Sequence, residues 1–518
     1  LKLLAKQPGL LSAWGVKMAR AIWHQSKLRH GQVAMILCVA VFFLKDGLHT
    51  WTSWSTGTRR LTGHQSVPPK VERWPRLRIQ RRQADSEEPS EAGGAKATVK
   101  STIVSLAKGM LGSGALSLSA GAAAFTHSSQ GLGVATIIIL GMTMLSAYTF
   151  QMVAESSADT GGDDFGNTWA ASVGQSTAWL PRLAVGVMSF ITCTVYAMIL
   201  ADLTSSILQT IVSALPMLGA VKPFCARTPT LIGVTCFVLL PLCLAEDFSS
   251  LSFTSTLGLA ACVYLAFFSL WRALDGSYVS GGKFFKLAPY QPCALSSASK
   301  LEDIVNPRAL IFLSNISTAY MNHGMAPATF QELAKGSGTS SNSLRRYALA
   351  VSGAFGVAGF VCTAMMVAGL YTFGANVNGL LLNNYAGTDL AAALGKVGVL
   401  LSVLFGFPLN FLLLRNEVLA IVNRGRTPLD ANQRRVLSTI LLLVAAGPAF
   451  VLKDIGLIQA VFGCIFGPYL VFIAPAAMSR SLRQQKGSIR RRRAAVEVLL
   501  TLCGILLGFL GLYVNLRR

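Results

Sequence analysis

The sequence predicts an all-α polytopic membrane protein with about eleven transmembrane helices. Of its 518 residues, 52% are hydrophobic and only 13% are charged, about half the charged fraction of ordinary soluble domains. From Ser101 onward, apolar runs long enough to cross a bilayer follow one another with short breaks. These runs lack period-two alternation, so they predict helices rather than the strands of a membrane barrel.

Residues 1–97 differ from the rest of the chain in composition. Seventeen of the 45 Lys and Arg residues, but only six acidic residues, lie in the first 100 positions. The apolar run at 33–44 is too short to span a bilayer, so it fits either a cleaved targeting segment or an interfacial helix. We expect a basic, mostly flexible N-terminal region over 1–97 and a transmembrane domain over 98–518.

Eleven apolar runs are predicted to cross the membrane, separated by polar, charged, Gly or Pro residues. They lie at Ser101–Phe125, Val134–Ala154, Leu183–Leu215, Thr230–Leu244, Leu251–Trp271, Pro307–Phe330, Tyr347–Phe373, Ala391–Val422, Val436–Leu452, Ile455–Met478 and Ala494–Val514. Because the number is odd, the two ends of the predicted bundle lie on opposite sides of the bilayer.

The charge of the connections predicts the orientation. The connections after the sixth, eighth and tenth runs are rich in Lys and Arg, and the last of these holds seven cations within residues 480–493. The intervening connections are poorer, with no cation between Gly374 and Leu390. The positive-inside rule therefore places the N-terminus in the cytosol and the C-terminus outside or in a lumen. Such a basic excess indicates contact with the lipid bilayer rather than with nucleic acid.

The first apolar run contains an unusual group of glycines. Gly109, Gly112 and Gly114 lie within six residues near its middle, where each costs about 1 kcal/mol against Ala in a helix. One interpretation is a broken helix whose backbone groups face a ligand. The alternative is a stripe of small residues that lets two helices pack closely.

The sixth run is interrupted by polar residues and a proline. Asn322, His323, Gly324 and Pro327 cluster near its middle, which is costly unless they line a cavity or restore each other's hydrogen bonds. His323 fits either a functional group or a buried structural histidine. Interruptions in the first and sixth runs together predict a five-plus-five inverted repeat with one extra helix, as in transporters that bind substrate at half-helix ends.

Three motifs in order resemble the amino acid/auxin permease family, over about 101–514. Gly112 to Leu116 is similar to its first-helix Gly-Ser/Thr-Gly-aliphatic-Leu signature, and His323 to Leu333 is similar to its sixth-helix segment. Phe407-Pro408 through Arg415 is similar to its eighth-helix stretch. Two positions depart from the pattern: Ser119 stands where a proline is common, and Pro327 lies one residue early.

The resemblance implies an amino acid transporter of the LeuT-like fold, with no catalytic residues. It implies that substrate lies between the two interrupted helices, at Gly112, Ser113, Gly114, Ala115, Asn322, His323 and Gly324. Neither interruption holds an acidic residue that would indicate a cationic substrate. Neutral amino acids are therefore favoured.

The coupling ion can be predicted from two positions of the same resemblance. Sodium-coupled members tend to have Asn four residues before the first motif glycine and Thr two residues before the eighth-helix proline. Lys108 and Gly406 occupy these positions, and a fixed ammonium opposes sodium binding. We therefore expect proton coupling or exchange, as in the proton-coupled branch, with Lys108, Asp202 and His323 as ion-coupling candidates. Asp202 equally fits a plain hydrogen bond to Thr204 or Ser205.

Two of the ten cysteines fall in polar connections. Cys225 follows the third run and Cys293 follows the fifth, both on the predicted outer face, where disulfides can form. A disulfide between them resembles proton-coupled members of the family, and the alternative is two free thiols. No Cys-x-x-Cys pair and no metal-ligand spacing of histidines are present in the sequence, so we expect no metal and no cofactor.

Two other functions remain open beside transport. A membrane-embedded amino acid sensor or scaffold would use the basic tail to bind a partner. A polytopic membrane enzyme is less consistent with the sequence, because five of the six histidines lie outside the interrupted runs. Plasma membrane and the membrane of an acidic organelle both fit proton coupling.

Overall fold

The computed structural model describes residues 97–244, 251–296, 306–335, 340–422, 430–487 and 491–516. Within these ranges the regular structure is helical, apart from one isolated parallel bridge between Ser128 and Ser296. The predicted N-terminal region 1–97, with its apolar segment at 33–44, lies outside the described residues except for its last position.

Eight helices in the described ranges are long and apolar enough to cross a membrane, and a bent pair of shorter helices raises the number to nine. The bent pair is α3 and α4, at Val99–Met110 and Ser113–Phe125. The eight are α5 (Ser129–Thr160), α7 (Trp179–Ala214), α8 to α9 (Arg227–Leu244), α10 (Leu251–Leu274), α13 (Ser340–Phe373), α14 (Leu390–Val422), α16 to α17 (Ile455–Gln485) and α18 (Arg491–Leu516). A short helix α6 (Phe165–Ser172) joins α5 to α7.

Two of the eleven predicted spans are too short to pass as single membrane helices. The segment predicted at Pro307–Phe330 forms α11 (Ala309–Ala319) and α12 (Ala326–Ala334), with an interruption between them. The segment predicted at Val436–Leu452 forms α15 (Ala431–Ala446) and a 3-10 turn over Gly447–Phe450. The structure thus supports an integral membrane bundle of at least eight spans among the described residues.

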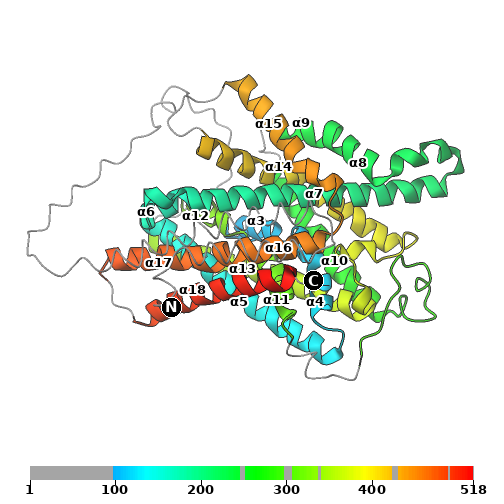
Figure 1. The fold of residues 1–518 in the computed structure, drawn as a ribbon, viewed down its shortest axis with the longest axis horizontal. Helices are drawn as coiled ribbons and strands as arrows, with labels where there is room; N and C mark the ends of the chain where they lie inside the picture. The colour runs from blue at the N-terminus through cyan, green and yellow to red at the C-terminus, as the bar shows by residue number, and fades with distance from the viewer. Residues whose placement is uncertain are drawn as a thin grey trace, which may run out of the picture. The chain divides into compact units, whose positions relative to one another are not determined.

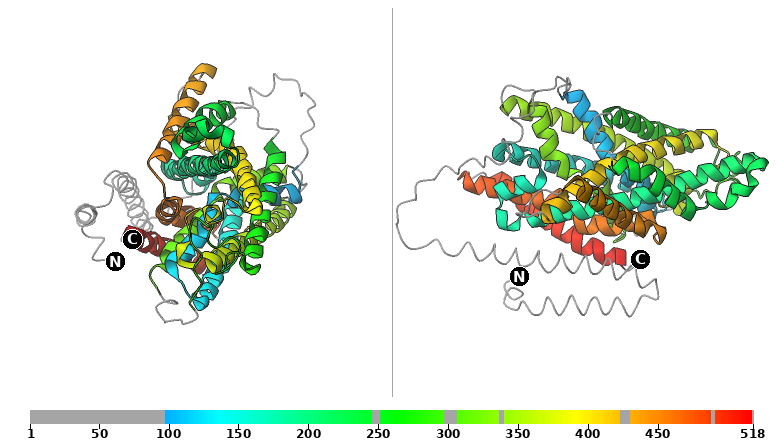
Figure 2. Two further views of the ribbon diagram at one scale, coloured as in Figure 1. Left: turned by 90° about the vertical axis from the view of Figure 1, so that its right-hand side faces the viewer. Right: turned by 90° about the horizontal axis from the view of Figure 1, so that it is seen from above.

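Helix α7 occupies a central position in the bundle (Figure 1), where it lies alongside α14. Of its most apolar stretch, 78% of the residues are buried, against 22% for α18 at the periphery. Helix α11 packs against both α4 and α16, and α13 packs against α4 and α5. The long helices run in broadly similar directions, and Figure 2 shows several of them nearly end-on. Because α4 packs against α11 and α13, and α11 packs against α4 and α16, the two interrupted segments lie inside the bundle.

Apolar side chains cover the outer surface of several long helices. Phe237, Leu274 and Leu390 are more than 80% exposed, and Met144 and Ile137 are more than 70% exposed. Exposed large apolar side chains recur along α15 (Ala431–Ala446) and α18 as well, and water-soluble monomers rarely expose apolar surface on this scale. The exposed faces are those of helices that contact lipid.

Candidate functional site

The first predicted span is broken, as the glycines indicated. Helix α3 ends at Met110, Leu111 leaves the helical conformation, and α4 begins at Ser113 with an axis bent by 49°. Gly112 is the N-cap of α4, and no side chain caps its first turn. The first amides of α4 have no intrahelical partner and carry the positive end of the helix dipole, so this turn is suited to an anion.

The sixth predicted span is interrupted too. Helix α11 ends at Ala319, and the chain then turns through Tyr320 to Asn322 and a 3-10 turn over His323–Met325 before α12 begins. The amide of Asn322 donates to the carbonyl of Tyr320 over 2.9 Å, which departs from the helical pattern. Carbonyls at the end of α11 consequently lose their regular helical partners.

The two interruptions lie directly against each other. A Cβ added to Gly109 would lie 2.6 Å from Nδ2 of Asn322, and one added to Gly114 would lie 2.5 Å from Cα of Ala319. The glycines thus serve both purposes considered from the sequence. They accompany a break in the helix, and Gly114 lets α4 approach α11 without a side chain between them.

A cavity of about 100 Å³ lies between these interruptions, α7 and α14. The interruptions contribute mainly Gly, Ser, Asn and Met residues, α7 contributes one face, and Asn410 and Leu413 come from α14. The lining residues are Gly109, Met110, Gly112, Ser113, Gly114, Val185, Met188, Ser189, Thr192, Tyr196, Thr318, Ala319, Met321, Asn322, Gly324, Met325, Asn410, Leu413 and Leu470. None of these is Asp, Glu, Lys, Arg or His, so the cavity offers dipoles and hydroxyls rather than charges.

Five of the seven predicted substrate residues line this cavity: Gly112, Ser113, Gly114, Asn322 and Gly324. Ala115 is buried and is not among the lining residues. His323 is also outside the lining, and its side chain is fully buried against α5. Its Nε2 lies 3.0 Å from Oγ1 of Thr149, and its ring meets the Phe150 ring at a centroid distance of 5.3 Å.

Lys108 extends from the end of α3 toward α10 and α14. A Cβ added to Gly258 of α10 would collide with the Lys108 side chain, and one added to Gly406 of α14 would lie 3.9 Å from its Nζ. Lys108 and Gly406, the two positions compared with sodium-coupled members of the family, are therefore neighbours in space. Lys108 lies beside the cavity and is not one of its lining residues.

Asp202 has a different partner from the one the sequence suggested. Its Oδ1 accepts a hydrogen bond from Nε of Arg227 over 2.6 Å. Arg227 also donates to the carbonyls of Ala449 and Leu452 over 2.8 and 3.0 Å. The partner of Asp202 is thus Arg227 rather than Thr204 or Ser205. The Ser205 hydroxyl donates to the carbonyl of Cys225. Asp202 thus joins α7 to the start of α8.

Cys225 and Cys293 are both free thiols in the structure. Cys225 is buried, with its Sγ 3.5 Å from the carbonyl of Val221, whereas Cys293 is exposed. The disulfide implied by the resemblance is thus not formed here, and oxidative pairing stays a prediction. Peptide mass maps with and without reductant distinguish the two forms.

The cavity face of α7 was missed in the sequence analysis. Ser189, Thr192 and Tyr196 line the cavity at positions i, i+3 and i+7 of that helix, so they lie on one face. Three polar side chains on one face of an otherwise apolar helix could have been recognised in the sequence as a candidate cavity lining. Asn410, one turn after Gly406 on α14, carried no periodic signal of its own.

The chain is similar to known proteins over most of its length. Residues 95–516 match the family described as transmembrane amino acid transporter protein. Vacuolar amino acid transporter 5 of Schizosaccharomyces pombe is 24% identical over 76% of this chain and 86% of that protein. Vacuolar amino acid transporter 2 of Saccharomyces cerevisiae is 21% identical over 77% and 79%, and Amino acid transporter AVT6E of Arabidopsis thaliana is 22% identical over 80% and 82%.

Proposed function

The chain belongs to the transmembrane amino acid transporter family, and from that premise we propose that it moves neutral amino acids across a membrane by alternating access to the central cavity. The observation that carries the proposal is the cavity between two interrupted helices, which has no charged side chain in its lining. A zwitterion has no net charge for such a site to balance. The volume of about 100 Å³, some three times that of a water molecule in the liquid, favours a small side chain.

We propose that the first turn of α4 binds the substrate carboxylate. The amides of Ser113, Gly114 and Ala115 lie in that turn, and Gly112 leaves it uncapped by a side chain. The substrate amino group would face the carbonyls released at the end of α11, near Asn322. Hydrogen bonds to ionised groups are about twice as strong as neutral ones, so these contacts can hold a zwitterion without charged side chains.

We further propose that the bundle has eleven spans, arranged as a five-plus-five inverted repeat with one extra helix. Segments α11–α12 and α15 are the two predicted spans that are too short to pass as single helices. A broken helix at the first and at the sixth position supports the repeat. We further assign 98–518 to the transporter domain and keep 1–97 as a preceding basic region.

We propose coupling to protons, or exchange, in place of coupling to sodium. The Lys108 side chain lies beside Gly406, where an ammonium would repel a sodium ion. His323 and Asp202 remain candidates for the proton path, although Thr149 and Arg227 already give them hydrogen-bond partners. Lys108→Asn should change the pH dependence or sodium dependence of uptake; an unchanged profile would contradict this assignment.

We place the protein in the membrane of an acidic organelle, with its N-terminus in the cytosol and its C-terminus in the lumen. Two relatives are named as vacuolar transporters. A membrane that maintains a proton gradient also fits the coupling proposed above.

Uptake of labelled alanine into proteoliposomes tests the proposal. We expect accumulation driven by a pH gradient in sodium-free buffer, or exchange with preloaded amino acid. Saturable binding without flux would contradict transport and favour an amino acid sensor. Stimulation by sodium alone would contradict the proposed coupling while leaving the cavity assignment intact.

A further inference from the structure

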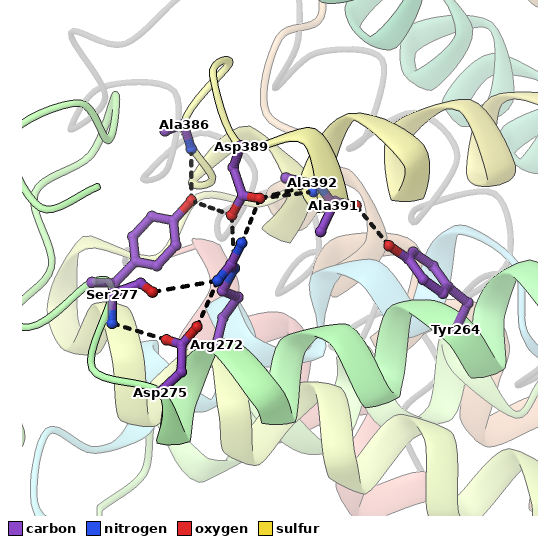
Figure 3. Close-up of polar contacts among 9 residues, drawn as sticks. Tyr264, Arg272, Asp275, Ser277, Ala386, Asp389, Ala391 and Ala392 are labelled. Atoms are coloured by element: carbon purple, nitrogen blue, oxygen red, sulfur yellow. Dashed lines mark hydrogen bonds and ion pairs between the residues drawn. The ribbon is translucent and has the colours of Figure 1, made fainter. Parts of the chain in front are cut away.

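A second polar cluster lies where the end of α10 meets the start of α14 (Figure 3). The Arg272 guanidinium donates to both carboxylate oxygens of Asp389, over 2.7 and 2.8 Å, and to Asp275 over 2.5 Å. The Asp389 carboxylate is buried and also accepts from the Tyr278 hydroxyl and from the amide of Ala391. Its hydrogen-bonding capacity is therefore filled from within the chain.

A cavity of about 570 Å³ adjoins this cluster, more than five times the volume of the central one. We call it the α10–α14 pocket; Tyr264, Arg272, Lys283, Phe284, Leu390 and Leu394 are among its lining residues. Lys283 is exposed, and its Nζ lies 5.2 Å from the centre of the Phe284 ring. Within the described ranges Lys283 forms no ion pair. Because Arg272 is committed to Asp389 and Asp275, Lys283 is the cation of the pocket that remains available to a ligand.

One side of the α10–α14 pocket is apolar and faces outward. Leu390 and Leu394 are 84% and 60% exposed, and Val397 continues the same face of α14 one turn further into the span. On a membrane-spanning helix such a face contacts acyl chains. Trp271 is half-exposed beside Arg272, with the guanidinium 4.4 Å from the ring centre. Trp at the end of a span marks the level of the lipid headgroups.

We propose that the α10–α14 pocket binds a phosphate-bearing lipid. Lys283 would hold the phosphate at the mouth of the pocket, and the Leu390, Leu394 and Val397 face would hold one acyl chain. A free amino acid could satisfy Lys283 but would leave the leucine face uncovered. The bound lipid would brace the outer ends of α10 and α14 beside the Arg272 cluster. The inference requires a membrane-embedded chain and does not depend on which substrate is carried.

Thermal unfolding of the full chain in detergent tests the lipid site, with dioctanoyl phosphatidylglycerol as the probe. We expect this lipid to raise the unfolding midpoint in a saturable manner. Lys283→Gln should raise the half-saturating concentration about fivefold, the effect typical of one basic residue near anionic lipid. Lys286→Gln is the matched control, because Lys286 is exposed on the same connection and does not line the pocket.

Two further probes separate the sources of binding energy. Dioctanoylglycerol should stabilise the chain less than the phospholipid, and inorganic phosphate should not reproduce the shift. Equal stabilisation by inorganic phosphate, or by dioctanoylglycerol, would overturn a site for the intact lipid. Equal effects of Lys283→Gln and Lys286→Gln would overturn the role of Lys283. Displacement of the phospholipid by alanine would indicate a substrate vestibule and would overturn the lipid site.

Leu394→Ser tests the acyl contact separately, because it leaves Lys283 in place. This variant should also weaken lipid binding.

Discussion

Gly112 lines the cavity between the interruptions and faces Tyr196 of α7. A Cβ added there would lie 2.6 Å from the hydroxyl oxygen of Tyr196, whose side chain is only 5% exposed. The nearest ring atom of Tyr196 would lie 3.6 Å away, which is an ordinary van der Waals contact. The conflict at this position is therefore with one hydroxyl group.

Gly112→Ala should weaken uptake affinity about fivefold or more, because overpacking of this kind costs about 1–3 kcal/mol and each 1.4 kcal/mol is a factor of ten. In the Tyr196→Phe background the same substitution should cost much less, since the conflicting oxygen is gone. Gly141→Ala is the matched control, as a Cβ there meets nothing within 4 Å. The measurement is the concentration dependence of alanine uptake in proteoliposomes. Additive losses in the double variant would show that Gly112 and Tyr196 do not meet as described.

Asp275 gives the α10–α14 region a dependence on pH. It lies just beyond the last residue of α10. Burial raises the pKa of its carboxyl group, but the Ser277 amide and the Arg272 guanidinium outweigh this and hold the pKa below its ordinary value. A carboxyl group whose pKa is lowered by folding stabilises the fold at pH values above its ordinary pKa of about 4. This contribution is lost as the pH falls from that value through the lowered pKa of the folded state.

The unfolding midpoint of the unsubstituted chain should therefore fall as the pH is lowered from about 5 to about 3. Asp275→Asn should make this fall smaller, because the variant has no carboxyl group to protonate at this position. The matched control is Glu332→Gln, which removes an exposed acid of α12. A pH profile that is unchanged in Asp275→Asn would show that this ion pair does not contribute to stability.

Single residues were only partly predictable from the sequence. The position of Gly112 and Gly114 in the cavity lining followed from a rule about helix breaks. His323 looked similar to Asn322 and Gly324 along the chain, but the 3-10 turn directs its ring toward Thr149. Side-chain direction inside an irregular turn depends on tertiary packing, which no local pattern encodes.

At the scale of elements, α11 is held between helices that approach it closely. A Cβ added to Gly463 of α16 would collide with the backbone carbonyl of Ser314, and one added to Gly114 of α4 would collide with Ala319. Backbone atoms cannot move aside as a flexible side chain can. The position of the interruption after Ala319 thus depends on glycines of two neighbouring helices.

Gly463→Ala should destabilise the bundle by about 1–3 kcal/mol, as overpacked cores do. The expected result is a lower unfolding midpoint in detergent. Gly356→Ala on α13 should be nearly neutral, because a Cβ there meets nothing within 4 Å. Equal midpoints for both variants would contradict the close crossing of α11 and α16.

The breaks themselves were predictable, whereas their partners were not. Clusters of Gly, Asn and Pro in apolar runs marked both interruptions, because such residues oppose a continuous helix. The close approach of Gly109 to Asn322, by contrast, joins residues more than 200 positions apart. The span predicted at Val436–Leu452 begins and ends later than α15 (Ala431–Ala446), because the apolar run continues through the 3-10 turn at Gly447–Phe450.

For the molecule as a whole, the basic connection before α18 lies on the same side as the end of α5. Lys486 forms an ion pair with Asp159 over 2.7 Å, and Arg493 lies 3.5 Å from Glu155. The proposed orientation places this side in the cytosol. Asp159 and Glu155, two acidic residues near the end of α5, are thus ion-pair partners of the most cationic connection.

In sealed right-side-out organelle vesicles, a protease added outside should cleave a site inserted near Gly487. An epitope fused after residue 518 should stay protected until the membrane is permeabilised. The opposite pattern of cleavage and protection would reverse the proposed orientation.

The central claim is that the first turn of α4 binds the carboxylate of an amino acid. An experimental structure with bound alanine tests it most directly. We expect the carboxylate oxygens to lie within about 2.7–3.2 Å of backbone amides of that turn, with the ammonium group facing the end of α11. Alanine bound elsewhere in the bundle, or a straight helix through Gly112 with no ligand beside it, would contradict the claim.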